Sequence, residues 1–249
     1  MNNVNSSPYF AIDDFNIFDK YSKDHDTKNK NTYDQRNNIK QKLLDLLPEI
    51  EEHISDNNYK LQKHWKKDYV CSSTKPNDRN GLFVDWIGIR LGKTKDEVDA
   101  FRDYENKDYY GYYSHACFQF SLFATGFWIG IYHSFSSGSI DRLYMREEMR
   151  NKVFSNKLSE VLANQDLKNF IWNFGKNQYD FSNYNKNEFL KFYKKYEKEN
   201  SESFFGILVA PNDERIQSKE IIISEIKNIM DYTNEIYKIT AKRYFSRNP

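Results

Sequence analysis

Two apolar segments joined by a Thr-Gly pair place the strongest constraint on the fold of this chain. Residues 116–123 alternate large apolar side chains with small or polar ones, which is the pattern of a half-buried strand. Thr125 and Gly126 supply a tight turn, and the apolar run of residues 127–133 follows at once. The pattern predicts two neighbouring antiparallel strands at the centre of a sheet.

Further segments predict the rest of the architecture. A turn at residues 75–81 joins two predicted strands into a second hairpin, and apolar residues at helical spacing indicate amphipathic helices. Strands and helices occur in runs without regular alternation, so we expect an α+β fold with helices packed on a mostly antiparallel sheet. The expected strands span residues 63–74, 82–90, 116–123, 127–133, 170–174 and 204–209, and the expected helices span residues 39–54, 143–162, 187–196 and 222–236.

The length of the chain bounds its domain organisation. Its 249 residues lie at the upper end of what one hydrophobic core supports. No linker rich in Gly, Pro or Ser interrupts it, so we expect a flexible tail over residues 1–9 and a single domain over residues 10–249. Inside that domain, Pro48 predicts a kink or break near Leu47, and the polar residues 20–38 predict a surface loop or a solvated helix start.

Composition excludes several classes of protein. Aromatic residues make up 17% of the chain, which argues against disorder. The formal net charge is +1, so contact with nucleic acid would need a local basic patch. Cys71 and Cys117 belong to no C-x-x-C pair, which favours a reducing compartment. Because we find no secretory signal and no apolar span of membrane length, we expect a soluble cytoplasmic protein without membrane contact.

Several short motifs follow one another along the chain. They are Asp14-Phe15, the cluster from Lys63 to Lys67, Lys75-Pro76-Asn77, Trp86, the strand from His115 to Gln119, Phe170-Ile171-Trp172, Gly206-Ile207 and Tyr237. In their order and spacing, from about residue 10 to residue 240, they resemble the YktB-like family of uncharacterised bacterial proteins. The resemblance implies a shared fold and no catalytic assignment, since that family has no established activity. Residues 20–38 and 92–113 look like insertions relative to it.

A basic and aromatic cluster is formed by Lys63, His64, Trp65, Lys66 and Lys67. Lysines beside a stacking ring suit contact with a nucleotide or a single-stranded nucleic acid. The alternative is an edge strand whose lysines prevent pairing with another sheet. Both interpretations fit the same residues.

A tyrosine-rich loop precedes a histidine in the next segment. Tyr110, Tyr112 and Tyr113 offer flat, amphipathic contact area, which favours recognition of a base, a sugar or a protein, and His115 could act as an acid or base. The alternative is a loop packed on the sheet, with His115 bonded to a backbone carbonyl.

His115 and His133 are the candidate catalytic residues. They lie on the two arms of the predicted hairpin, with His133 expected opposite about residue 118, so we place them near the same end but not as cross-strand partners. Asp141 could be a third ligand, yet no H-E-x-x-H or C-x-x-C spacing occurs, and we predict neither a metal nor a cofactor.

A loop of small residues leads into the predicted helix after His133. Arg142 and Arg146 lie one helical turn apart there and could hold a phosphate or carboxylate. The alternative is an N-cap by Ser139 with a solvated arginine face. The triplet from Glu225 to Lys227 matches the E-x-K element of metal-dependent nucleases, but its surroundings predict a helix, so we interpret the match as chance.

These features support two main functional hypotheses. The first is a binding or interaction module for a nucleic acid, a nucleotide or a protein, with a face formed by the basic cluster, the tyrosine loop, His115 and Arg142. The alternative is a hydrolase or nuclease of a defence or housekeeping system that uses His115 or His133 as acid or base. A third hypothesis is a purely structural role in a complex.

Overall fold

The computed structural model describes residues 8–19, 30–64, 70–76, 82–105, 111–135 and 138–243. Most of the predicted tail lies outside these residues. Tyr9, at the end of that tail, is tied to the domain: its backbone N–H donates to the carbonyl of Gln217 at 2.8 Å, and its hydroxyl donates to the carbonyl of Lys42 at 2.6 Å.

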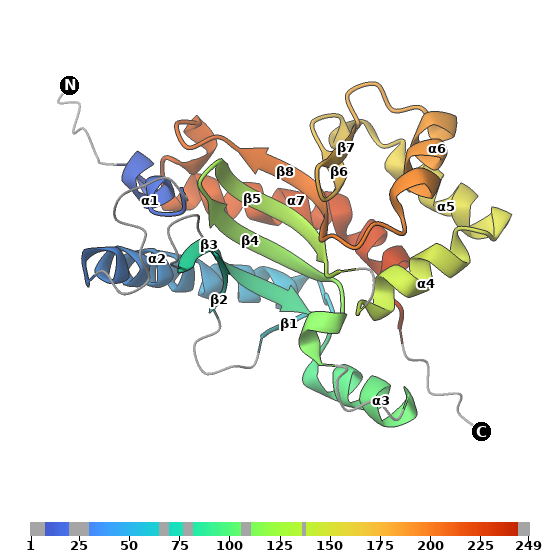
Figure 1. Cartoon of the computed structure of the whole chain (residues 1–249), viewed down its shortest axis with the longest axis horizontal. Coiled ribbons are helices and arrows are strands. Elements are labelled where there is room, and N and C mark those ends of the chain that lie inside the picture. The colour runs from blue at the N-terminus through green and yellow to red at the C-terminus, as the bar shows by residue number, and fades with distance from the viewer. Residues whose placement is uncertain are drawn as a thin grey trace.

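An antiparallel sheet of eight strands forms the centre of the molecule (Figure 1). Its strands follow the order β1-β3-β4-β5-β8-β6-β7, and β2 also pairs with β3. The strands are β1 (Gln62–Lys63), β2 (Val70–Pro76), β3 (Leu82–Gly92), β4 (Cys117–Phe123), β5 (Gly126–His133), β6 (Ile171–Phe174), β7 (Asn177–Asp180) and β8 (Ser203–Val209).

Seven α-helices accompany the sheet in the described part of the chain. They are α1 (Ile12–Asn16), α2 (Lys30–Asp56), α3 (Lys95–Glu105), α4 (Ile140–Glu148), α5 (Lys152–Leu162), α6 (Lys186–Tyr196) and α7 (Lys219–Thr240). The α+β class with helices packed on an antiparallel sheet is therefore confirmed.

The predicted central hairpin is confirmed as β4 and β5. Phe123 pairs with Gly126 across the turn, and Cys117 pairs with Tyr132 at the far end. Gly126 has a φ of +146°, a backbone conformation that residues other than glycine rarely adopt. The pairing of the two strands is shifted by two residues from the register that we expected for His133, because the turn begins directly after Phe123.

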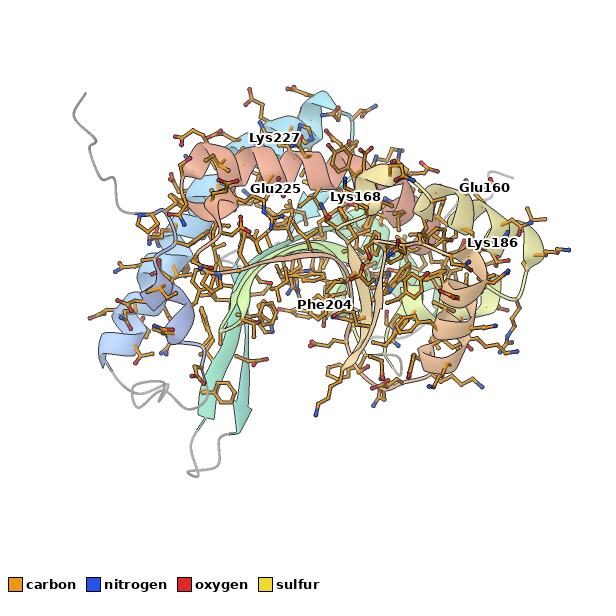
Figure 2. All side chains as sticks on the ribbon, turned by 90° about the horizontal axis from the view of Figure 1, so that it is seen from above. Glu160, Lys168, Lys186, Phe204, Glu225 and Lys227 are labelled. Atoms are coloured by element: carbon orange, nitrogen blue, oxygen red, sulfur yellow. The ribbon has the colours of Figure 1, made fainter. Side chains whose placement is uncertain are left out.

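Helices α2 and α7 cover one face of the sheet. Their apolar stripes, for example Leu43 on α2 and Ile226 on α7, are fully buried against alternate residues of the strands, such as Phe120 and Ile129. Figure 2 shows the sheet as an arch with α7 on its outer side and Phe204 on its inner side. The main hydrophobic core therefore lies between the outer face of the arch and these two helices.

Two paired glycines lie at the inner face of the arch. Gly130 on β5 pairs with Gly206 on β8, and a Cβ atom on either would collide with the backbone of the other strand. The inner face between them is lined by aromatic side chains, among them Trp128 and Phe204, whose ring centroids lie 5.1 Å apart. Two strands can approach this closely only where side chains are absent.

Several elements differ from the sequence-based expectation. Helix α2 runs through Pro48 without a break, whereas its start at Lys30 agrees with the solvated helix start that was one alternative for the polar segment. The single helix expected over residues 143–162 is two helices, because the side chain of Asn151 accepts the backbone N–H of Val153 and starts α5. Strand β7 was not expected. In the described part of the chain, no helix is both long and apolar enough to cross a bilayer.

Candidate functional site

A fully buried charge network joins Lys93, His115 and Asp141. The Nζ atom of Lys93 lies 2.8 Å from each carboxylate oxygen of Asp141 and 2.8 Å from Nδ1 of His115. The backbone N–H groups of Ala116 and Lys242 also donate to Asp141. The network thus ties together the end of β3, the start of β4, the start of α4 and the chain after α7.

The electrostatics of this network indicate a structural role. The nearby Lys93 and His115 hold the pKa of the Asp141 carboxyl well below its usual value despite burial. Burial lowers the pKa of both Lys93 and His115. An ammonium paired with a carboxylate, beside a neutral imidazole, satisfies all three donors of the lysine. Since Lys93 and Asp141 are 0% exposed and His115 is 2% exposed, no substrate can reach the group.

His133 lies at the same end of the hairpin but does not join this network through a hydrogen bond. Its ring is buried, and its Nε2 has no hydrogen-bond partner among the described residues. Burial lowers its pKa to about 4, so the ring is neutral at physiological pH. Neither candidate histidine therefore faces solvent. In the described part of the chain, no group of His, Cys, Asp and Glu has the arrangement of a metal site.

The guanidinium of Arg142 is hydrogen-bonded to main-chain carbonyls. Its guanidinium donates to the carbonyls of Glu197 at 3.2 Å, of Glu199 at 3.1 Å, and of Ser201. The Oγ of Ser139 accepts the backbone N–H of Arg142 at 3.2 Å, which confirms the predicted N-cap. Arg142 thus fixes the chain that follows α6 against α4 and has few donors left for an external anion.

The predicted basic and aromatic residues are spread over several environments. Lys63 pairs with Glu51 at 3.0 Å, and His64 is buried with its ring centroid 4.3 Å from that of Tyr112. Tyr112 is buried as well, whereas Tyr113 is 43% exposed. Trp65, Lys66, Lys67 and Tyr110 lie outside the described residues.

A buried arginine fills the inner face of the arch near these tyrosines. The guanidinium of Arg90 lies 4.0 Å from the ring centroid of Tyr132 and 4.9 Å from that of Trp86, and its Nε donates to Gln119 at 2.8 Å. Arg90 is only 3% exposed. Arg90 was not among the residues predicted from the sequence. Its position at the end of an apolar strand run was the feature that could have pointed to it.

Four basic side chains line one cavity of about 390 Å³. Arg146 and Arg150 approach it from α4 and the residues after it, and Lys194 and Lys198 approach it from α6 and the residues after it. We call this cavity the basic pocket. None of the four forms an ion pair within 4 Å among the described residues. Only Arg146 was a candidate from the sequence. Each pair has i, i+4 spacing, but Arg150 and Lys198 lie just beyond the ends of α4 and α6.

Glu197 is the carboxylate of the basic pocket. Burial raises its pKa, and the positive charges of Arg146, Lys198, Arg150 and Lys194 oppose that rise. Four cations thus surround one carboxylate. The basic pocket keeps an excess of positive charge that no described residue neutralises.

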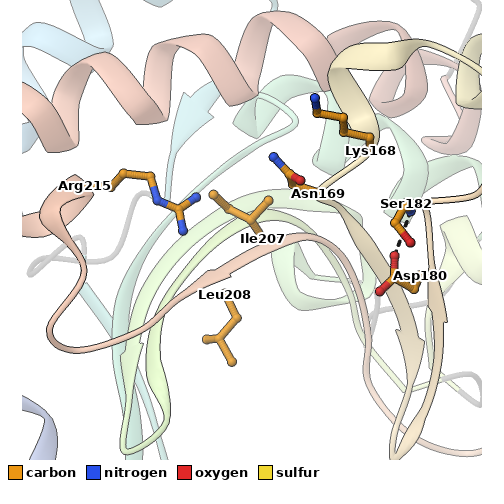
Figure 3. A pocket seen from close by; sticks show the side chains of 7 residues that line it. All are labelled: Lys168, Asn169, Asp180, Ser182, Ile207, Leu208 and Arg215. Atoms are coloured by element: carbon orange, nitrogen blue, oxygen red, sulfur yellow. Dashed lines mark hydrogen bonds between the residues drawn. The ribbon is translucent and has the colours of Figure 1, made fainter.

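A second hollow, of about 480 Å³, lies beside the end of β8 (Figure 3). Lys168 and Arg215 are its basic residues. Arg215 pairs with Asp213 at 2.8 Å and with Glu225 at 3.5 Å, and Asp180 adds a negative charge to the lining. Positive and negative charges are therefore balanced in this hollow, unlike in the basic pocket.

The triplet from Glu225 to Lys227 lies on α7, on the outer side of the molecule (Figure 2). Its helical location is as predicted, and the ion pair of Glu225 with Arg215 gives that carboxylate a structural partner. This supports the interpretation of the E-x-K match as chance.

No family model matches the sequence, and no curated protein matches it. The resemblance to YktB-like proteins therefore stays a prediction.

Proposed function

We propose that this protein is a binding module that holds the phosphate groups of a nucleotide or of a single-stranded nucleic acid in the basic pocket. The observation that carries the proposal is the set of four basic side chains around one cavity of about 390 Å³ without an ion-pair partner in the described part of the chain. A phosphate would supply the negative charge that this cavity lacks.

Several cations elsewhere in the described part of the chain are paired with carboxylates. Lys42 pairs with Asp14 at 2.7 Å, and Arg243 pairs with Glu97 at 2.6 Å. Lys219 lies 3.3 Å from both Asp45 and Glu49. The basic pocket differs from these sites because four cations line one cavity whose only carboxylate is Glu197.

Arg142 supports the proposal indirectly. Its bonds to the carbonyls of Glu197 and Glu199 hold the end of α6 beside α4, and this places Lys194 and Lys198 across the cavity from Arg146. A helix end would otherwise present carbonyl oxygens that repel an anion. Arg142 is therefore a positioning residue in this proposal, not the anion ligand that we expected.

The alternative of a hydrolase or nuclease has less support. It requires His115 or His133 beside a substrate, and both rings are buried. Cytoplasmic location, bacterial origin and membership in the YktB-like family remain parts of the proposal that rest on the sequence. A protein partner would be the remaining class of ligand.

Binding of a fluorescein-labelled oligothymidylate, measured by fluorescence anisotropy at low salt, tests the proposal. We expect R146E/K194E to weaken binding by about tenfold or more, and the affinity of the wild type to fall steeply with salt. The matched control is K157E/K238E, which makes the same charge change at exposed lysines of α5 and α7 outside the pocket.

Two outcomes would overturn the proposal. One is no binding of the wild type at low salt, and the other is equal weakening by both double variants. A nucleoside triphosphate added as competitor distinguishes the two ligand classes: displacement at micromolar concentration indicates a nucleotide site, and its absence indicates a site that needs a longer backbone.

A further inference from the structure

Arg90, Lys93 and Arg142 are the buried basic side chains in the described part of the chain, and their partners differ. Lys93 is paired with Asp141, and Arg142 donates to main-chain carbonyls after α6. Arg90 has neither kind of partner among the described residues. Its one hydrogen bond there runs from Nε to the side-chain oxygen of Gln119 at 2.8 Å. Arg90 is therefore the buried cation whose charge the described residues leave unbalanced.

Arg90 lies on the inner, concave side of the arch that Figure 2 shows. Ile89, directly before it on β3, packs into the main core, and successive side chains of a strand point to opposite faces. In the sheet Arg90 pairs with Gln119, and the same row continues through Gly130 and Gly206. Only the first two residues of this row carry side chains on the inner face.

Three aromatic rings surround the guanidinium of Arg90. Its Cζ lies 4.0 Å from the ring centroid of Tyr132, 4.9 Å from that of Trp86 and 5.5 Å from that of Tyr113. Such contacts contribute about 0.5–2 kcal/mol each, whereas the desolvation of a buried ion costs several kcal/mol. Tyr113 is 43% exposed, so this aromatic cage extends to the molecular surface.

The surroundings of the aromatic cage supply no negative charge from a described residue. The ionisable groups that act most strongly on the Arg90 charge are thiols and phenols. Burial raises the pKa of the Cys117 thiol to about 12 and raises the pKa of the Tyr112 and Tyr132 hydroxyls, so these three groups are neutral at physiological pH. Glu202 accepts the Tyr132 hydroxyl at 2.8 Å and forms no ion pair with Arg90.

The free edge of the guanidinium is formed by its two terminal nitrogens. No described residue accepts a hydrogen bond from Nη1 or Nη2 of Arg90, and neither nitrogen is fully enclosed. This edge presents parallel N–H donors in a fixed plane, which match the two oxygens of a carboxylate. The Lys93 ammonium, by contrast, already has its acceptors inside the fold.

We infer that Arg90 binds the carboxylate group of a ligand on the inner face of the arch. One carboxylate balances one guanidinium, whereas a phosphate dianion would bring more negative charge than the described lining neutralises. Trp86 and Tyr113 would contact the body of the ligand with their rings. This site shares no residue with the basic pocket and does not depend on the proposed function.

Titration with benzoate, followed through the Nε–H resonance of Arg90 in ¹⁵N-labelled protein, tests the inference. We expect a saturable shift, and we expect benzamide, which has the same shape without the charge, to bind at least about tenfold more weakly. No saturable shift, or equal affinity for the two compounds, would overturn the inference. Tighter binding of inorganic phosphate at the same resonance would overturn the assignment to a carboxylate.

A carboxylate can come from a free acid or from the end of a protein chain, and acetyl-glycylglycine separates these sources. Tighter binding of this peptide than of benzoate indicates the C-terminus of a partner, and tighter binding of benzoate indicates an aromatic acid. Either result supports a carboxylate site, whereas binding of the peptide amide as tight as that of the free peptide would contradict it.

Variants separate carboxylate recognition from general attraction by charge. Arg90→Lys keeps the positive charge and removes the two-pronged edge, so we expect benzoate binding, read through the Trp86 indole resonance, to weaken by about tenfold. Arg150→Lys, the same substitution in the basic pocket, is the matched control with unchanged benzoate affinity. Wild-type affinity in Arg90→Lys would contradict the inference. The ligand series on the wild type remains decisive if that variant fails to fold.

The double variant R146E/K194E keeps this test distinct from that of the proposed function. It removes two cations of the basic pocket and leaves the aromatic cage intact, so it should bind benzoate like the wild type. Loss of benzoate binding in this variant would place the carboxylate in the basic pocket and overturn the assignment to Arg90.

Discussion

The buried network and the basic pocket both combine basic side chains with one carboxylate, but in a different balance of charge. In the network, one ammonium, one carboxylate and one imidazole satisfy each other without solvent. In the basic pocket, four cations surround one carboxylate. The comparison shows that residue type alone does not separate structural from binding charges. Matched and buried groups hold the fold together, whereas unmatched groups at a cavity can recruit a partner.

Asp141→Ala should produce the largest loss of stability. It leaves the Lys93 ammonium and two backbone N–H groups buried without their acceptor, and breaking a buried pair in this way costs about 3–5 kcal/mol. The measurement is urea unfolding followed by circular dichroism. The control is Asp231→Ala, a 43% exposed partner of His53, which should cost less than about 1 kcal/mol. Similar losses for both would refute the structural role of the network.

Acid should weaken the fold through His133. Its pKa in the folded state is about 4 and its ordinary value is 6.5, so the unfolded chain binds more protons between these values. The stability from a neutral, buried His133 is therefore complete above pH 6.5 and is lost as the pH falls toward 4, by up to about 3 kcal/mol. Unfolding curves across this range should show a shallower dependence for His133→Phe. An unchanged slope would mean that His133 does not titrate with unfolding.

Arg142→Met should cause an intermediate loss of stability. It tests both regions, because Arg142 follows Asp141 of the buried network and holds the end of α6 at the basic pocket. It leaves the carbonyls of Glu197 and Glu199 without their donor, at a cost of about 2–3 kcal/mol, and it should also weaken oligonucleotide binding because the end of α6 loses its anchor. The same readouts on Arg150→Met provide the control, since that exposed residue should affect binding with little change in stability. Full binding by Arg142→Met would argue against its positioning role.

The smallest effect on stability is expected for R146E/K194E. Neither side chain has an ion-pair partner among the described residues, so the free energy of unfolding should stay within about 0.5 kcal/mol of the wild type while binding falls. Thermal unfolding checks this expectation. A large destabilisation would instead assign these cations to the fold.

Local patterns predicted much of the architecture but little of the candidate sites. The alternation around Thr125 identified β4 and β5, because a period of two is a property of each strand by itself. The register was missed by two residues, since it depends on where the turn closes, and the split at Asn151 was missed because a cap competes with an apolar stripe that continues past it. Arg146 was found on its own helix, while its partners across the cavity were not.

The sequence by itself determined most of the segments that become strands and helices and which of their faces are apolar, because those properties depend on neighbours a few residues away. Only the tertiary structure decided that Lys93 meets Asp141 and that Arg146 faces Lys194, since such contacts join segments separated by 48 residues or more. The physical reason is that the charge state and accessibility of a side chain depend on what packs around it, and packing is settled only when distant elements come together.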